Sequence, residues 1–320
     1  MMGIGAVLKH VHRLSIFTML LGSLFASSQT AAATRALVIA GLGGNLEYNQ
    51  AFDKHTRIAV EALQTVTMAS SHVIYLQGDT ANRQSVLDTI SSMVGEVNEL
   101  EGTDDAVDTF ILIMMGHGNV NRNGWNFNLS GPDLSTPDLI GALAPLNVAQ
   151  QVIVASTSAS GALLKPLAQP GRTVITATKS GGEINAVRFS EYFADALANE
   201  AADVDRNELL SVDEAFIYAN NLTVQYYEEK KLLASEHARF EGKDAGSVTL
   251  ATLGALRDAQ NNPAVAALLD ERALLETTFY QVKARKTSLS KTDYYEELEA
   301  VLIDIANVQK RIDSLIGSGS

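Results

Sequence analysis

The chain has 320 residues, of which 46% are hydrophobic and only six are proline, a composition typical of a well-packed globular protein with more than one structural unit. Its formal net charge of −13 argues against a nucleic acid or an anionic membrane surface as its partner. It contains no cysteine, which excludes disulfide scaffolds and thiol catalysis.

The first 33 residues are typical of a secretory signal peptide. A basic start with Lys9 and Arg13 precedes an apolar stretch, Leu14–Ala26, that is too short to span a bilayer comfortably. Small residues follow, and a cut between Ser28 and Ala33 satisfies the cleavage rule. We therefore predict a secreted, periplasmic protein with no membrane attachment after cleavage. An uncleaved membrane anchor is the alternative.

Beyond the signal peptide, short apolar runs alternate with segments of helical periodicity. The runs that predict strands are Ala36–Ala40, His72–Leu76, Thr109–Met115, Val152–Ala155 and Arg172–Ala177. The segments that predict helices are Ala51–Thr67, Asp79–Leu100, a helix opened by Thr136-Pro137-Asp138, Ala162–Leu167, Arg188–Asn199 and Ser211–Leu233. This alternation predicts an α/β domain with a mostly parallel sheet sandwiched by helices. Alternating Trp125, Phe127 and Leu129 predict a small β-arm within it.

Two neighbouring strand ends carry residues whose side chains can take part in catalysis. The strand Thr109–Met115 runs into Gly116-His117-Gly118, and the next strand runs into a polar segment that contains Ser158. Parallel strands end on the same edge of a sheet, where ligands of α/β proteins gather. The sequence therefore predicts that His117 and Ser158 lie side by side. The alternative is a turn histidine without a role and a serine that bonds local backbone groups.

These two strand ends resemble the caspase-like fold of cysteine peptidases, and most of all the legumain-type branch. The motifs that carry the resemblance are Gly116-His117-Gly118 and Thr157-Ser158-Ala159-Ser160-Gly161. The resemblance implies a caspase-like sheet, a catalytic histidine at His117 and a nucleophile position at Ser158. It also implies that the flanking glycines, together with Glu183 and Arg188 after the next strand, bind the substrate. For Glu183 and Arg188 the alternative is a surface ion pair or a helix-start charge.

The serine at the nucleophile position departs from the family pattern. A thiol with a pKa of about 8.5 supplies some thiolate unaided, whereas a serine hydroxyl needs a well-placed base with an acid behind it. The sequence shows no clear acid for that role, although the resemblance makes Asn45 or Asn49 a candidate to orient His117. We therefore expect a pseudopeptidase that binds peptides or protein partners and requires no cofactor. An endopeptidase that uses a Ser158/His117 dyad is the alternative.

Residues 203–214 match the calcium-binding loop of an EF-hand. The expected oxygen ligands are Asp203, Asp205, Asn207, the backbone carbonyl of Leu209 and a bidentate Glu214. The exception is Glu208, which stands where a glycine normally makes a left-handed turn. Weak, structural calcium binding is one expectation, and it supports a third alternative, a calcium-stabilised structural protein of the envelope. The other interpretation is a helix connection in which Ser211 caps the next helix.

The pattern changes after the α/β domain, which we assign to residues 34–250. In residues 251–320, Pro263 opens a helix in which Leu268, Leu275 and Val282 are seven apart. A last helix carries apolar residues in alternating steps of three and four: Leu298, Val301, Ile305, Val308, Ile312 and Leu315. This pattern predicts an antiparallel helical hairpin or short coiled coil. Its apolar seam packs on itself, on the α/β domain or on a second copy, which would give a homo-oligomer.

Overall fold

The protein is built on a six-stranded sheet in the order β10-β8-β7-β3-β1-β2. The computed structural model describes residues 33–66, 72–103, 106–242, 248–259 and 262–317. Only β10 is antiparallel to its neighbour. The strands of this sheet are β1 (Ala33–Ala40), β2 (His72–Leu76), β3 (Val107–Gly116), β7 (Gln150–Thr157), β8 (Arg172–Thr176) and β10 (Arg239–Glu241). The predicted signal peptide lies outside the described residues, except for Ala33 at the start of β1.

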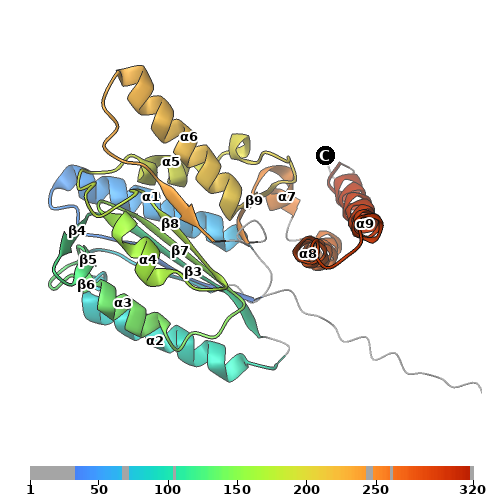
Figure 1. Ribbon diagram of the computed structural model, residues 1–320, viewed down its shortest axis with the longest axis horizontal. Coiled ribbons are helices and arrows are strands. Elements are labelled where there is room, and N and C mark those ends of the chain that lie inside the picture. The colour runs from blue at the N-terminus through green and yellow to red at the C-terminus, as the bar shows by residue number, and fades with distance from the viewer. Residues whose placement is uncertain (1–32, 67–71, 104–105, 243–247, 260–261, 318–320) are drawn as a thin grey trace, which may run out of the picture.

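Helices cover both faces of the sheet (Figure 1). One face packs against α1 (Leu46–Thr65), α5 (Phe189–Ala196) and α6 (Val212–Lys230). The other face packs against α2 (Arg83–Leu100), α3 (Thr136–Leu143) and α4 (Leu164–Leu167). Residues 110–115 of β3 are completely buried, because a parallel strand beneath two helical layers turns neither face to water. The predicted α/β sandwich is therefore confirmed.

A three-stranded arm follows β3 at the carboxyl end of the sheet. It consists of β4 (Gly118–Asn121), β5 (Gly124–Phe127) and β6 (Leu134–Ser135). The rings of Trp125 and Phe127 stack with centroids 5.9 Å apart and are fully buried. The predicted β-arm thus exists, and its aromatic side chains belong to the core that lies beneath α2 and α3.

Three helix starts differ from the sequence-based expectation because nearby side chains cap them. Asn45 accepts a hydrogen bond from the backbone of Tyr48, so α1 begins at Leu46, before the first predicted position. A short 3-10 turn, η1 (Gly78–Thr80), comes before α2, which Asn82 caps. The helix expected to open at Thr136 is α3, and the hydroxyl that caps it belongs to the preceding residue, Ser135.

The segment after α5 contains short strands that carry too little pattern to be predicted. β9 (Leu209–Ser211) pairs with β11 (Thr249–Thr252) in a small sheet of its own, and β10 closes one edge of the main sheet. Each strand has three or four residues, too few for alternation to stand out. A short helix, α7 (Gly254–Ala259), then leads to the tail.

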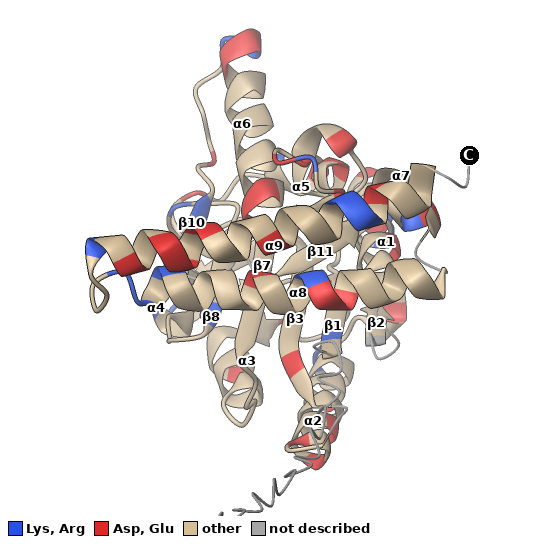
Figure 2. Ribbon diagram, turned by 90° about the vertical axis from the view of Figure 1, so that its right-hand side faces the viewer, with Lys and Arg blue, Asp and Glu red and all other residues tan. Residues whose placement is uncertain are grey.

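The tail forms the predicted helical hairpin of α8 (Pro263–Ala284) and α9 (Lys291–Gly317), which lie side by side (Figure 2). Its core contains Leu256, Val265, Leu268, Leu269, Val308 and Ile312. Leu315 is exposed, and the next residue, Ile316, packs inward in its place. The hairpin and the β-arm lie toward opposite ends of the molecule (Figure 1). Within the described part of the chain, no helix combines the length and apolar composition needed to cross a membrane.

Candidate functional site at the carboxyl edge of the sheet

The structure brings His117, Gly118 and Ser158 together at one edge of the sheet. Strands β3 and β7 are parallel neighbours in which Gly116 pairs with Thr157, so His117 and Ser158 are the next residues of the two strands. Gly118 packs directly on this junction: a Cβ there would lie 2.6 Å from the Ser158 carbonyl oxygen and 2.6 Å from Trp125 Nε1. Trp125 Nε1 donates to the same carbonyl at 3.3 Å. Glycine is required at position 118 because the backbone of the arm packs directly against the backbone of β7, with no room for a side chain.

The ring of His117 is held by an aromatic pair on α1 and by a backbone carbonyl. Tyr48 and Phe52 meet it edge-on, with ring centroids 4.6 and 5.0 Å away. Burial lowers the pKa of His117, and a hydrogen bond to the backbone of Gly43 opposes that shift. The neutral imidazole is therefore the favoured form, with a ring N–H directed at the Gly43 carbonyl.

Asn49 positions this histidine indirectly. Its Oδ1 accepts a hydrogen bond of 2.7 Å from the Gly43 amide, which fixes the peptide whose carbonyl holds the ring. A Cβ on Gly43 would lie 2.4 Å from the Asn49 amide, so the loop closes tightly on α1. Asn45 serves only as the N-cap of α1. Of the two asparagines considered from the sequence, Asn49 is the one connected to His117.

Ser158 is only 2% exposed, and among the described residues no hydrogen bond joins its hydroxyl to His117. The next residue, Ala159, has a left-handed backbone with φ of 57°, and its amide donates to the Glu183 carbonyl at 2.8 Å. Nor does a carboxylate hydrogen-bond to the His117 ring anywhere in the described ranges. The arrangement therefore lacks both contacts that a serine nucleophile needs.

Glu183 lies beside Ala159, whose amide donates to the Glu183 backbone carbonyl, but its carboxylate is occupied. It accepts from the Lys179 amide at 2.8 Å, from the His237 amide at 3.1 Å and pairs with His237 Nδ1 at 2.5 Å. Burial raises the pKa of Glu183, but these hydrogen bonds outweigh burial and bring it below its ordinary value. Nothing in the local sequence pattern around His237 marks so distant a partner.

Arg188 lies at the start of α5, in the N-cap position. Its guanidinium lies 4.9 Å above the ring of Tyr226 and 3.4 Å from Glu191. The Arg188 and Phe189 amides both donate to Glu236, whose side chain caps α5 from a loop far along the chain. Arg188 thus fits the alternative of a helix-start charge. Sequence reasoning missed Glu236, for which no local signal exists.

The acidic loop of residues 203–214 gathers three of its predicted ligands. Asp203, Asp205 and Glu214 offer oxygens that all lie within 4.8 Å of one another. Partial burial raises the pKa of Asp205 to about 6, and the neighbouring Glu214 and Asp203 carboxylates add to the shift. An oxygen-only donor set of this kind fits calcium in its chemistry.

Glu208 and Glu214 of this loop accept hydrogen bonds from backbone amides, and only the partner of Glu214 in the capping box was expected from the sequence. Glu208 adopts the left-handed turn, with φ of 61°, while its carboxylate accepts from the Leu256 amide at 2.6 Å. Glu214 forms the expected capping box with Ser211 and also accepts from the Val204 amide at 2.9 Å. A cation would have to compete with these amides for Glu214. Asn207 presents its backbone carbonyl to the buried Arg272 of α8, which connects the loop to the hairpin.

The fold and this edge define an α/β protein whose parallel strands bring a histidine and a serine together. No family model and no curated protein sequence matches the chain. Among solved structures, the Drosophila initiator caspase Dronc is similar, with a TM-score of 0.43 and 10% identity over 78% of this chain and 95% of its own. Caspase-1 from Spodoptera frugiperda has a TM-score of 0.43 and 9% identity, covering 67% and 88%. A secreted C11 cysteine protease from Bacteroides thetaiotaomicron has a TM-score of 0.37 and 12% identity, covering 62% and 60%.

Proposed function

We propose that this chain is an exported homologue of caspase-like and legumain-like peptidases that binds peptides or protein partners without cleaving them. The observation that carries the proposal is the state of Ser158, which is buried and makes no hydrogen bond to His117 among the described residues. A hydroxyl without a base in contact is a poor nucleophile, and the sequence offers no cysteine in its place.

The surroundings of the edge support binding. Leu42, Val120 and Ile184 come from the loop after β1, from β4 and from the loop after β8, and they are 47%, 45% and 70% exposed. A Cβ on Gly181 would lie 2.8 Å from Val120, so β4 and the loop after β8 touch. Exposed apolar side chains around a polar strand edge are typical of a surface that receives another chain. The testing experiment measures peptide binding and cleavage by the wild type beside Ser158→Ala and Ser158→Cys variants, and we expect binding without cleavage.

A second function, structural calcium binding by residues 203–214, is proposed from the cluster of three carboxylates. A cation at about 100 times its Kd adds about 2.7 kcal/mol to the free energy of unfolding. We expect calcium to raise the melting temperature at pH 8, and Asp205→Asn to weaken this response. Glu99→Gln, an exposed acid on α2, is the matched control.

The effect of calcium is expected to depend on pH. The folded pKa of Asp205, about 6, lies above its ordinary 3.8, so without calcium its contribution to stability is complete below about 4 and is lost as pH rises through about 6. Calcium relieves the repulsion only where the carboxylate is ionised, so the rise in melting temperature should fade below pH 6. An equal melting temperature with calcium and with a chelator at pH 8 would exclude the site.

We also propose that the hairpin joins two copies of the chain. Tyr295, Leu302 and Ile303 are exposed on the outer face of α9 and line a groove of about 370 Å³. Acidic residues gather in the first half of α9, and Lys310 and Arg311 follow in the second half (Figure 2). Arg311 is bonded to Glu271 of α8, whereas antiparallel pairing about a two-fold axis near Leu302 places the acidic first half of each α9 along the partner's Lys310.

The expected result is a dimer by light scattering at micromolar concentration, because the outer face of α9 then becomes buried. Leu302→Glu should shift the mass to that of a monomer, since it buries charge at the two-fold axis. Leu233→Glu, at a residue 95% exposed on another surface, is the control and should leave the dimer intact. A monomeric wild type would contradict this proposal.

A further inference from the structure

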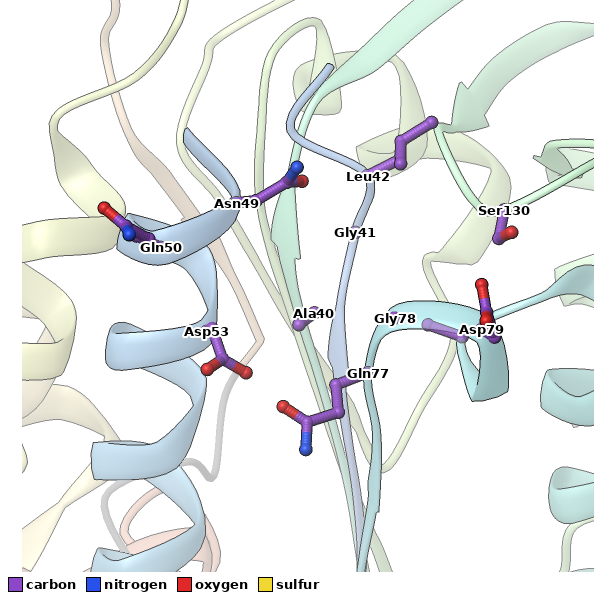
Figure 3. A pocket seen from close by; sticks show the side chains of 11 residues that line it. Ala40, Gly41, Leu42, Asn49, Gln50, Asp53, Gln77, Gly78, Asp79 and Ser130 are labelled. Atoms are coloured by element: carbon purple, nitrogen blue, oxygen red, sulfur yellow. The ribbon is translucent and has the colours of Figure 1, made fainter. Parts of the chain in front are cut away.

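A polar pocket lies at the carboxyl ends of β1 and β2, beside the edge that carries His117. It has a volume of about 430 Å³ and opens between α1 and the turn after β2 (Figure 3). The residues that line it include Gly41, Asn49, Asp53, Gln77, Asp79 and Ser130. The site described above uses only Asn49 of these, through its bond to Gly43.

The pocket and the His117 site share a wall. Asn49 lines the pocket while its Oδ1 holds the Gly43 amide, whose carbonyl holds His117. The sheet order β7-β3-β1-β2 sets the distance between this pocket and Ser158, which follows β7. Neighbouring strands lie about 4.8 Å apart, so a pocket between the ends of β1 and β2 lies about 12 Å from the end of β7. An extended peptide covers about 3.3 Å per residue, so three or four residues span that distance.

Two carboxylates, Asp53 and Asp79, line the pocket. Asp53 is already partnered by Arg57 at 3.1 Å and by the Tyr75 hydroxyl at 2.8 Å. Asp79 is exposed and, among the described residues, has no ion pair. Figure 3 shows its carboxylate pointing toward Ser130, which lies on the same side of the pocket, across from α1. Arg57 also reaches Gln77, whose Oε1 accepts from its guanidinium at 3.1 Å. Within the described ranges, Asp79 is therefore the lining carboxylate that a cationic group would meet without a competing cation bonded to it.

We propose that this pocket receives a lysine or arginine side chain of the bound peptide, three or four residues away from the position beside Ser158. This inference rests on the proposed peptide-binding function of the edge. Asp79 supplies the charge, the Ser130 hydroxyl supplies an acceptor, and the apolar walls at Ala40 and Ala81 contact the aliphatic part of the side chain. The pocket thus selects among peptides, whereas the edge holds their backbone.

The test measures fluorescence anisotropy of the full mature chain with a set of extended neutral peptides in which a single lysine is moved one position at a time. We expect the tightest binding at one lysine position, and a loss of about threefold to fivefold when the lysine is displaced or replaced by glutamine. Asp79→Asn should remove this preference, so that every lysine peptide binds it with the same affinity as the all-neutral peptide does. Glu47→Gln, an exposed acid in the first turn of α1 outside the pocket, should retain it.

The outcomes separate the two proposals. Peptide binding that ignores the lysine position, or a preference that persists in Asp79→Asn, overturns the basic subsite and leaves the binding edge standing. Failure of every peptide to bind overturns the edge as a peptide site and the subsite with it. A preference that disappears in Asp79→Asn and survives in Glu47→Gln supports the inference.

Discussion

Replacing Gly118 by alanine should destabilise the protein by about 3 kcal/mol. The new methyl group would lie 2.6 Å from the Ser158 carbonyl oxygen and 2.6 Å from Trp125 Nε1, closer than nonbonded atoms can approach. Relief requires β4 to move away from β7, which breaks the 3.3 Å hydrogen bond between Trp125 and Ser158. The cost combines overpacking with a lost buried hydrogen bond. Urea denaturation followed by the fluorescence of Trp125, the single tryptophan, measures it.

Gly95→Ala is the matched control. Gly95 lies within α2, and a Cβ there meets no atom within 4 Å. Alanine is favoured over glycine in a helix by about 1 kcal/mol, so this variant should be neutral or more stable. If Gly118→Ala unfolded at the same urea concentration as Gly95→Ala, the close contact between the arm and β7 would be wrong.

Replacing Glu236 by alanine should cost about 3 kcal/mol, because the side chain is 3% exposed and satisfies three donors. It accepts from the amides of Arg188 at 2.7 Å and Phe189 at 3.1 Å, and from the Tyr227 hydroxyl at 2.9 Å. Without it the first turn of α5 and a hydroxyl of α6 lose their acceptor in the interior. Thermal and urea unfolding measure the change.

Two further variants sharpen the result. Glu236→Gln keeps one carbonyl acceptor and should cost less than Glu236→Ala. Glu228→Ala removes an exposed carboxylate of α6 and should stay within about 0.5 kcal/mol of the wild type. Equal stability of the Glu236→Ala and Glu228→Ala variants would show that Glu236 does not cap α5.

The sheet could be predicted because its signals are local. The run Thr109–Met115 is apolar on both faces, and it forms the centre of a strand that is covered on both sides. Successive strands separated by helical segments then dictate parallel pairing, which brings Gly116-His117-Gly118 next to Ser158. Strands β9, β10 and β11 escaped prediction, because a run of three or four residues acquires its structure from its partner strand and not from its own pattern.

The site could be predicted only in its backbone positions. The sequence indicates which residues follow β3 and β7, but the partners of their side chains come from distant segments. His117 lies against Tyr48 and Phe52, and Glu183 pairs with His237, residues separated by more than 50 positions. The spacing of Tyr48 and Phe52 by four residues, with Asn49 between them, was a signal that α1 presents an aromatic face toward the sheet edge.

The backbone contacts around Ser158 are separate from the contacts that catalysis would need. Trp125, Gly118 and the Ser158 carbonyl form backbone-level contacts that do not depend on the side chain at position 158. A hydroxyl at this position therefore costs the fold little. Catalysis is more demanding, since it requires the nucleophile to contact a base that is itself oriented by an acceptor. The described residues supply the acceptor, Gly43, but not the contact.

The most direct test of the account is cleavage of a diverse peptide library by the purified mature protein, beside its Ser158→Ala and Ser158→Cys variants. Binding of the same peptides is measured in parallel. The account predicts that the wild type and Ser158→Ala bind peptides equally and that neither cleaves them. Cleavage by Ser158→Cys alone agrees with it, because a thiolate needs less help from His117 than a serine does. Cleavage by the wild type that disappears in Ser158→Ala would contradict it and would make Ser158 a working nucleophile.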